Sequence, residues 1–336
     1  MSGKLLAIGD TYLPLDLIEP ALAVLATDRA IEVRSVTPNE RPGISEVHEY
    51  QGDPDRIAEW TQGADILLVH AAAVTRTVFE RNPQLRIVAC ARGNPVNVDL
   101  QAARDHGVTV LHTPAKNADS VADLTMVSTH MLFRGMHRAQ NWLRRESEAG
   151  ETHLDSTFVG GQFMAREPAG ATIGIIGYGA IGQRVARQAE RYGMHVLAYD
   201  PYRTEADVEL VDLPELLRRS DVVTLHAKAS AENRHLIGAD ELALLKPGAF
   251  VINTARQSLL DEVALLAGLE SGAIGGAALD VCEPDGVWPQ LALRDDVIIT
   301  PHLGGATAQT QQRAMAMLVA DIQAIESGQS AKFVAA

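Results

Sequence analysis

The chain has 336 residues, more than one hydrophobic core usually accommodates, so we expect two domains. Acidic side chains outnumber basic ones 43 to 29, and the net charge of −14 argues against nucleic acid or an anionic membrane as a partner. Cys90 and Cys282 are too few for a disulfide framework and lack metal-ligand spacing, which is typical of a reducing compartment, and we expect no metal site. We find no cleavable apolar leader and no apolar span of about 20 residues, which indicates a cytoplasmic protein.

The first 115 or so residues alternate between apolar, strand-like runs and helix-like segments. This pattern predicts strands at 4–8, 31–36, 66–69, 85–89 and 108–111, and helices at 15–26, near 57–60, near 78–79 and at 98–106. Strands that alternate with helices form a parallel sheet flanked by helices. We therefore expect a small α/β domain here.

A long, mostly apolar stretch follows at residues 117–137, with Asp119 or Ser120 as a plausible N-cap. It is too hydrophobic for a surface helix, which indicates burial between domains or subunits. Residues 146–170 form a looser, glycine-containing passage that leads into the next motif.

Residues 172–200 have the order of parts that a dinucleotide site requires: an apolar strand, a G-x-G-x-x-G turn, a helix, a second strand and an acid. The first glycine permits a tight turn, the second lets a diphosphate approach the backbone, and the third lets the helix pack closely. Asp200 stands 18 positions after the last glycine, a suitable place for a carboxylate that binds ribose hydroxyls. The turn predicted to bind cofactor consists of Gly177, Tyr178, Gly179, Ala180, Ile181 and Gly182.

Beyond Asp200 the units repeat, with predicted helices at 213–219, 239–245 and 261–271 and strands at 222–225, 249–253, 275–281 and 297–300. A final helix at 307–326 comes after the last strand and can return to the first domain. The predicted fold class is α/β, with two doubly wound, Rossmann-like parallel sheets, the cofactor domain inserted into the other. The expected domains are residues 1–116 with 308–336, and residues 117–307.

Three of the predicted strand ends in the second domain are followed by side chains suited to catalysis. They carry Arg256, the two acids Glu283 and Asp285, and His302. Ligands of an open α/β sheet bind beyond these carboxyl ends. A guanidinium can hold a carboxylate by two hydrogen bonds, an imidazole can move a hydroxyl proton, and a carboxylate can orient the imidazole. This set suits hydride transfer at a carbon that bears oxygen.

Four stretches resemble the NAD-dependent D-isomer-specific 2-hydroxyacid dehydrogenase family: residues 91–125, the turn from Gly177, residues 244–281 and residues 300–307. The resemblance implies that Arg256 binds the substrate, that His302 is the acid/base, and that an acid after Asp280 orients His302. Relatives place that acid four or five residues past the strand aspartate, as a glutamate before proline. Asp285 has the spacing and Glu283 has the Glu-Pro context. We favour Asp285 and keep Glu283 as the alternative.

The same resemblance implies NAD as the cofactor, a small 2-hydroxy or 2-oxo acid as the substrate, and a homodimer formed through the helix at 117–137. Family members bind cofactor between the domains, and the amino-terminal domain closes over the substrate. Besides the glycine turn, the expected cofactor-binding residues are Thr125, Asp200, Pro201, His226, Thr254, Ala255, Arg256, Asp280, His302 and Gly304. The expected substrate-binding residues are Ala72, Ala73, Arg92, Gly93, Asn94, Arg256 and His302.

The chain departs from the family pattern in two places. Gln257 follows the arginine where relatives usually have glycine. Residues 70–73, His-Ala-Ala-Ala, replace a serine-rich turn or an arginine. The second change leaves one fewer cation, which makes a phosphorylated substrate less expected, although Arg92 could still bind a phosphate group.

Two classes of function remain. The first is an oxidoreductase that interconverts a 2-hydroxy acid and its 2-oxo acid with NAD(H). The second is a cofactor-sensing binding protein like the C-terminal-binding protein corepressors, which resemble this family. We favour the enzyme because the chain ends soon after its last helix, without a tail for recruiting partners. A resemblance to formate dehydrogenase would require glutamine where an acid stands here.

Overall fold

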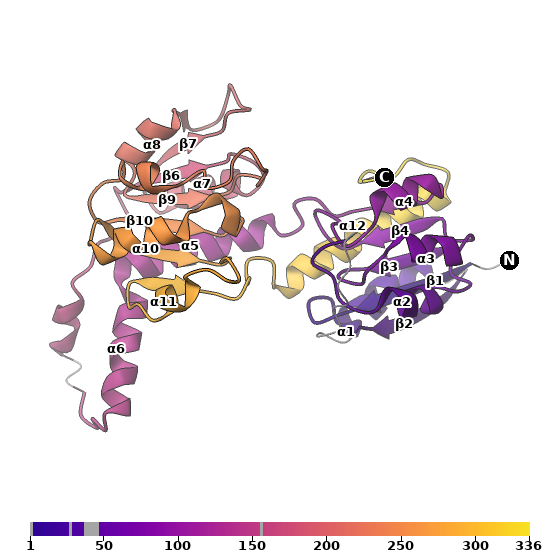
Figure 1. Cartoon of the computed structure of the whole chain (residues 1–336), viewed down its shortest axis with the longest axis horizontal. Coiled ribbons are helices and arrows are strands. Elements are labelled where there is room, and N and C mark those ends of the chain that lie inside the picture. The colour runs from indigo at the N-terminus through magenta and orange to yellow at the C-terminus, as the bar shows by residue number, and fades with distance from the viewer. Residues whose placement is uncertain (1–2, 27–28, 37–46, 155–156) are drawn as a thin grey trace. The chain divides into compact units, whose positions relative to one another are not determined.

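The computed structural model describes residues 3–26, 29–36, 47–154 and 157–336. The chain forms two units (Figure 1), which we call unit 1 (Met1–Lys116 with Ala306–Ala336) and unit 2 (Asn117–Gly305). Unit 2 is one continuous segment, whereas unit 1 is built from the two segments that flank it in the sequence.

Unit 1 is organised around a parallel sheet with the strand order β2-β1-β3-β4-β5. Its strands are β1 (Lys4–Gly9), β2 (Ala30–Ser35), β3 (Ile66–Val69), β4 (Ile87–Cys90) and β5 (Thr109–Leu111). Its helices are α1 (Leu15–Leu22), the 3₁₀ helix η1 (Ala23–Leu25), α2 (Pro54–Trp60), α3 (Arg76–Arg81), α4 (Leu100–Asp105) and α12 (Ala308–Glu326). Every residue of β3 and β4 is buried, which explains why these strands appear as short apolar runs in the sequence.

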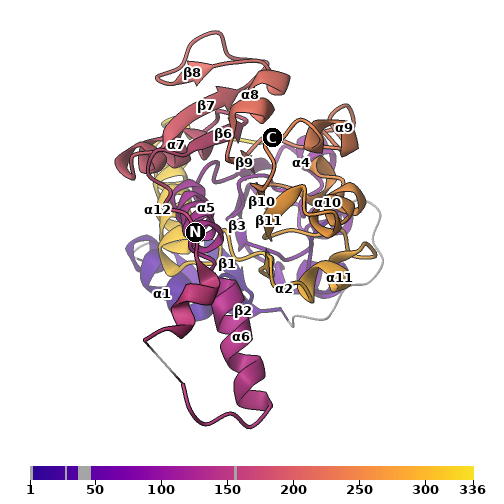
Figure 2. The same cartoon turned by 90° about the vertical axis from the view of Figure 1, so that its left-hand side faces the viewer.

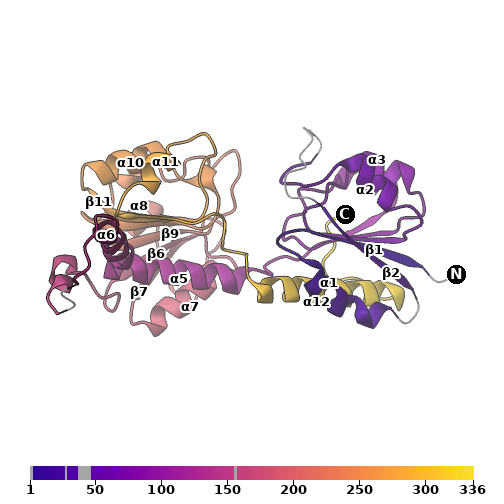
Figure 3. The ribbon, with the colours of Figure 1, turned by 90° about the horizontal axis from the view of Figure 1, so that it is seen from below.

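Helices cover both faces of this sheet. Leu6 and Ile8 of β1 pack in a core with α2, α3 and α4, and Leu5 and Ala7 pack on the opposite face with α1 and α12. Figure 3 shows α1 and α12 on one side of the sheet and α2 and α3 on the other. Near the end of the chain, Val334 forms an antiparallel bridge with Leu111 of β5, so the chain returns to the edge of this sheet.

Unit 2 contains a seven-stranded parallel sheet with the order β12-β11-β10-β9-β6-β7-β8. Its strands are β6 (Thr172–Ile176), β7 (His195–Tyr199), β8 (Glu209–Leu210), β9 (Val222–Leu225), β10 (Ala249–Asn253), β11 (Ile274–Leu279) and β12 (Val297–Ile299). Its helices are α5 (Ala118–Arg134), α6 (Met136–Glu148), η2 (Val159–Phe163), α7 (Gly182–Arg191), α8 (Leu213–Arg219), α9 (Ala239–Leu242), η3 (Gln257–Leu259), α10 (Glu262–Glu270) and α11 (Trp288–Ala292). One face of the sheet packs against α5 and α7, and the other against α8, α9, α10 and α11.

The two parallel sheets confirm the predicted fold class. The predicted helix over 117–137 is wrong in its end point, because α5 stops at Arg134 and Gly135 adopts φ +59° before α6 begins. Figure 2 shows α6 extending away from the sheet of unit 2, and its polar sequence explains why the apolar pattern did not predict it. No helix in the described ranges has the length and apolar character needed to cross a membrane.

Candidate functional site

The turn between β6 and α7 requires two of its three glycines for steric reasons. Gly177 has φ +95°, and a Cβ there would lie 2.4 Å from the backbone nitrogen of Ala227. A Cβ on Gly182 would lie 2.3 Å from the carbonyl oxygen of Gly177. A Cβ on Gly179 would meet no atom within 4 Å. The first and third glycines therefore close the turn, whereas the second leaves its backbone open to a ligand.

Asp200 follows β7 and is tied to the same turn. Its Oδ2 accepts a hydrogen bond from the backbone nitrogen of Tyr178 at 2.9 Å, and its Oδ1 accepts one from that of Tyr202 at 3.0 Å. Among the other predicted cofactor-binding residues of this region, Pro201 and Ala180 are exposed and Ile181 is half-buried. The carboxylate thus lies beside the open backbone at Gly179.

His226 follows β9, the strand next to β6 in the sheet. Its Nε2 lies 3.0 Å from the hydroxyl of Thr224, and its Nδ1 is buried without a partner among the described residues. Burial lowers the pKa of this imidazole to about 3, so the ring is neutral at physiological pH. The order of strands reverses between β6 and β9, which is the place where open α/β sheets bind ligands.

The end of β10 positions Arg256. The side chain of Asn253 accepts a hydrogen bond from the nitrogen of Ala255 and donates one to the carbonyl of Arg256, which fixes the turn. The exposed Arg256 guanidinium donates to the Ala255 carbonyl at 2.7 Å. Behind it, the hydroxyls of Thr254 and Thr125 lie 3.1 Å apart, so a residue of α5 adjoins this strand end.

Asp280 organises the turn that carries His302. The residue is 3% exposed, and its carboxylate accepts hydrogen bonds from the Thr300 hydroxyl at 2.5 Å, the Leu303 nitrogen at 2.7 Å and the Gly304 nitrogen at 2.8 Å. The Asp280 carbonyl accepts another from the His302 nitrogen at 3.0 Å. His302 itself is exposed and has φ +59°. Asp280 therefore shapes the backbone on both sides of the imidazole.

The two candidate acids lie on the loop after β11 in different surroundings. Glu283 is half-buried and its carboxylate lies 3.5 Å from Arg234, whereas Asp285 is exposed and its carboxylate bonds no described residue. The loop is anchored by Glu262, whose Oε1 accepts a hydrogen bond from the Glu283 nitrogen at 2.9 Å. Burial raises the pKa of Glu262, and its Oε2 has no partner among the described residues. We did not predict Glu262, because at the start of a helix an acid looks like an ordinary solvent-exposed residue.

In unit 1, the residues predicted to bind substrate follow β3 and β4. Ala72 and Ala73 expose no surface, and the nitrogen of Ala73 donates to the carbonyl of Gln51. Arg92 is paired with the carboxylate of Glu49 and also donates to its carbonyl. Gly93 and Asn94 are exposed beside it.

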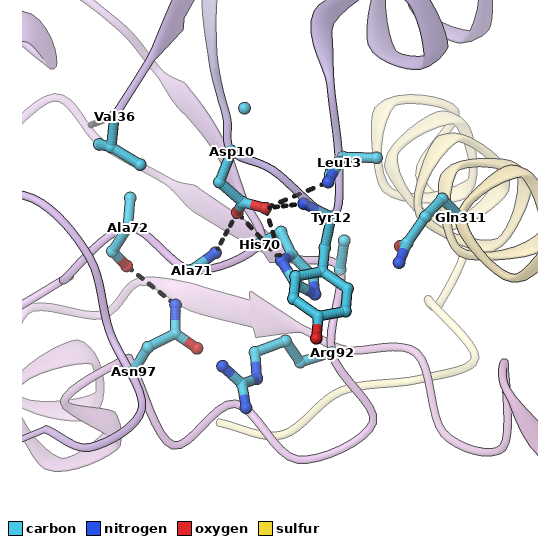
Figure 4. A network of polar contacts seen from close by, with 12 residues as sticks. Asp10, Tyr12, Leu13, Val36, His70, Ala71, Ala72, Arg92, Asn97 and Gln311 are labelled. Atoms are coloured by element: carbon cyan, nitrogen blue, oxygen red, sulfur yellow. Dashed lines mark hydrogen bonds and ion pairs between the residues drawn. The ribbon is translucent and has the colours of Figure 1, made fainter. Parts of the chain in front are cut away.

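Polar side chains that were not predicted also lie at this edge of the sheet (Figure 4). Asp10 follows β1, His70 follows β3, and their side chains form a hydrogen bond. Lys116 is buried, and its ammonium donates to the carbonyl of Ala91 at 2.6 Å and the side chain of Gln311 at 2.9 Å. Burial lowers the pKa of Lys116 to about 8.

The structure brings together the predicted residues of unit 2. The glycine turn, His226, Arg256 and the turn of His302 all follow strands at the carboxyl edge of one parallel sheet. The predicted residues of unit 1 lie at the carboxyl edge of the other sheet.

Comparison with known proteins gives a consistent result. Residues 126–304 match the sequence profile described as "D-isomer specific 2-hydroxyacid dehydrogenase, NAD binding domain". The chain is 36% identical over 83% of its length to D-3-phosphoglycerate dehydrogenase of Methanocaldococcus jannaschii, of which it spans 53%. It is 35% identical over 80% of its length to hydroxypyruvate reductase of Thermotoga maritima, of which it spans 87%. Among solved structures, the TT0316 protein of Thermus thermophilus aligns with 99% of this chain and 100% of its own, with TM-score 0.80 and 27% identity.

Proposed function

Because this chain belongs to the family of D-isomer specific 2-hydroxyacid dehydrogenases, we propose that it transfers a hydride between NAD(H) and a small 2-hydroxy acid or its 2-oxo acid. The match confirms the resemblance noted in the sequence and shows an NAD-binding domain, and the names of the relatives support an NAD-dependent oxidoreductase as the enzyme class. The observation that carries the proposed chemistry is the turn of His302, which Asp280 holds in an unusual backbone conformation within the unit that binds NAD.

The residues present fit NAD. The open backbone at Gly179 leaves room for the diphosphate at the start of α7, and Asp200 beside it suits the ribose hydroxyls. When bound, NAD(H) supplies or accepts the hydride at the substrate's second carbon. His226, Thr254 and Pro201 line the neighbouring strand ends and would complete its binding site.

The side chains of this chain perform the remaining chemistry. Arg256 binds the substrate carboxylate by two parallel hydrogen bonds and polarises the adjacent carbonyl. His302, as the imidazolium, protonates the oxygen that becomes a hydroxyl during reduction, and takes that proton back during oxidation. Asp285, or in its place Glu283, orients the ring and stabilises its protonated form.

A test of this function measures NADH oxidation against a panel of 2-oxo acids that includes glyoxylate, pyruvate, hydroxypyruvate and phenylpyruvate. We expect turnover with at least one, and we expect His302→Gln to lower kcat by about 10²–10⁴-fold without weakening NADH binding. The exposed His195 in unit 2 provides the matched control, His195→Gln. Normal kcat in His302→Gln would exclude the proposed role.

The domain roles follow from this proposal. We assign the substrate to the domain of residues 1–116 with 308–336, and NAD to the domain of residues 117–307. Cys90 and Cys282 are free thiols, which supports a cytoplasmic enzyme.

We also propose that the protein is a homodimer, with the second copy seated where the segment 117–137, to which the resemblance assigns the dimer, ends and α6 begins. Met136, the first residue of α6, is 58% exposed, and Phe158 and Met164, which flank η2, are 78% and 87% exposed. Met164 also lines a cavity of about 300 Å³, together with Phe133, Phe250 and Arg166, among others. Light scattering should give a dimer that Met136→Glu with Met164→Glu dissociates, whereas Val24→Glu on unit 1 should not.

Nothing in these findings favours the cofactor-sensing binding protein. The curated relatives reported above are named as a dehydrogenase and a reductase.

A further inference from the structure

The loop between β7 and β8, residues 200–208, packs against Tyr178 of the glycine turn. Tyr178 is 1% exposed. Its backbone nitrogen donates a hydrogen bond to the carboxylate of Asp200, and its hydroxyl donates one to the carboxylate of Asp207. The guanidinium of Arg203 lies 5.8 Å from the centre of the tyrosine ring. Tyr178 therefore holds this loop near both of its ends and in between, all within unit 2.

The hydrogen bond between Tyr178 and Asp207 gives the carboxylate a fixed place. Burial raises the pKa of Tyr178, so the hydroxyl keeps its proton at neutral pH and donates it. This hydrogen bond, together with the charges of Arg187 on α7 and Arg203 on the loop, lowers the pKa of Asp207. Asp207 is exposed, and at neutral pH it is ionised. A negative charge is therefore anchored close to two arginines.

Arg203 belongs to the part of the site at which NAD and NADP differ. NADP carries a phosphate group on the ribose next to the adenine, where Asp200 suits the hydroxyls of NAD. The backbone nitrogen of Arg203 donates to the carbonyl of Asp200 at 3.2 Å, so the two residues form one turn. An arginine near this aspartate is the residue type that accommodates the additional phosphate in NADP sites. With its charge uncompensated, Arg203 would attract NADP.

Asp207 provides the compensating charge. It faces Arg203, and its carboxylate adds to the negative charge of Asp200 on the same loop. Glu205 is a third acid of this loop and is also exposed, but its carboxylate bonds no described residue. The two acids differ, therefore, in that only Asp207 is tied to Tyr178 among the described contacts.

We propose that Asp207, held in place by Tyr178, is a specificity-determining residue that makes unit 2 select NAD(H) over NADP(H) by compensating the charge of Arg203. Tyr178 acts as a positioning residue for the carboxylate. The inference goes beyond the proposed function, because it concerns which cofactor binds and holds whatever the second substrate is.

The test measures the Kd values of NADPH and NADH for the full chain by the quenching of its tryptophan fluorescence. Low ionic strength is used because salt screens exposed charges. The compared quantity is the ratio of the Kd for NADPH to the Kd for NADH. Asp207→Asn removes the charge but keeps an oxygen that accepts the Tyr178 hydroxyl, so we expect the ratio to fall about fivefold. Glu205→Gln removes the same charge from the same loop and should leave the ratio nearly unchanged.

Two further variants test how Asp207 acts. Tyr178→Phe keeps the ring and releases the carboxylate, so it should also lower the ratio. Combined with Asp207→Asn, it should lower the ratio no further than Asp207→Asn alone, because both changes act through one charge. Adding Arg203→Gln to Asp207→Asn should restore the ratio of the parent, because the uncompensated cation is then removed.

Four results would overturn the inference. They are equal Kd values of the parent for both cofactors, an unchanged ratio in Asp207→Asn, an equal fall in Glu205→Gln, and a ratio that stays low when Arg203→Gln is added. If circular dichroism shows that Tyr178→Phe does not fold, the comparison of Asp207→Asn with Glu205→Gln decides. Reduction of 2-oxo acids by the parent is measured separately, so the proposed function stands or fails independently of these results.

Discussion

His302 has a backbone conformation that residues other than glycine rarely adopt, with φ +59°. Such conformations cost about 1–3 kcal/mol and persist only where surrounding contacts enforce them. Asp280 provides these contacts through three hydrogen bonds to its carboxylate. The position of the imidazole therefore depends on an aspartate 22 residues earlier in the chain.

We predict that Asp280→Asn lowers kcat and also destabilises unit 2. An amide nitrogen cannot accept a hydrogen bond, so at least one buried donor loses its partner, at a cost of about 1–3 kcal/mol. Urea unfolding and steady-state kinetics measure the two effects. Thr300→Val removes one hydrogen bond but keeps the charge of Asp280, so it should lower kcat and the free energy of unfolding by less. If Asp280→Asn changed neither quantity, Asp280 would not hold the turn of His302.

The choice between Asp285 and Glu283 is decided by the rate of reduction at neutral pH. His302 must give a proton to the product oxygen, and the carboxylate that orients its ring supports this step. We expect Asp285→Asn to lower kcat and Glu283→Gln to leave kcat unchanged, and the opposite result would transfer the role to Glu283.

The stability of unit 2 should depend on the protonation of His226. Its folded pKa of about 3 lies below the ordinary 6.5, so the unfolded chain takes up the proton first as the pH falls. The contribution of the neutral His226 to the free energy of unfolding is therefore fully present above pH 6.5 and is lost between pH 6.5 and 3. Urea unfolding at about pH 7.5, 6 and 5 should give a smaller decrease for His226→Gln. If the free energy of unfolding decreased equally with pH in the parent and in His226→Gln, His226 would take up its proton in the folded state.

The sequence allowed us to predict a functional role for residues such as Arg256 and His302, because each has a reactive side chain and directly follows a predicted strand. The contact between Asp10 and His70 was not predicted, because the two are 60 residues apart and meet only through the strand order. Neither residue type identifies a partner by itself.

At the scale of elements, the turn between β6 and α7 contains one glycine suited to cofactor binding and another that the fold requires. Gly179 faces open space, whereas Gly182 lies against the carbonyl of Gly177. We predict that Gly179→Ala folds like the parent but raises the Kd for NADH about tenfold or more, because a methyl group obstructs the diphosphate. Gly182→Ala should instead lower Tm. Unchanged NADH affinity in Gly179→Ala would place the diphosphate elsewhere.

The strands were predicted closely because buried parallel strands are short apolar runs, and β3, β9 and β10 match their predicted bounds. The sequence did not predict α6, whose residues are mostly polar, or β8, which has two residues. The bridge between Val334 and Leu111 was also missed, since pairing between distant segments leaves no local pattern.

At the scale of the whole molecule, the glycine turn and Asp200 both belong to unit 2. NADH should therefore stabilise unit 2 by about 2.7 kcal/mol at 100 times its Kd. Trp60 lies in unit 1, whereas Trp142 and Trp288 lie in unit 2, so a variant that retains only Trp60 and a variant that retains only Trp142 resolve the two units by fluorescence during urea unfolding. We expect NADH to raise the midpoint seen by Trp142. An equal rise seen by Trp60 would show that the units unfold as one.

The division of unit 1 into two segments has a consequence for synthesis on the ribosome. One face of its sheet, with Leu5 and Ala7, is covered by Ala314 and Leu318 of α12, and α12 is translated after all of unit 2. Only α1 covers part of this apolar face of the nascent sheet while unit 2, a continuous segment, emerges and folds. Chaperones that bind exposed apolar surface can therefore bind unit 1 for as long as unit 2 is being translated. Slower translation of unit 2 lengthens this time.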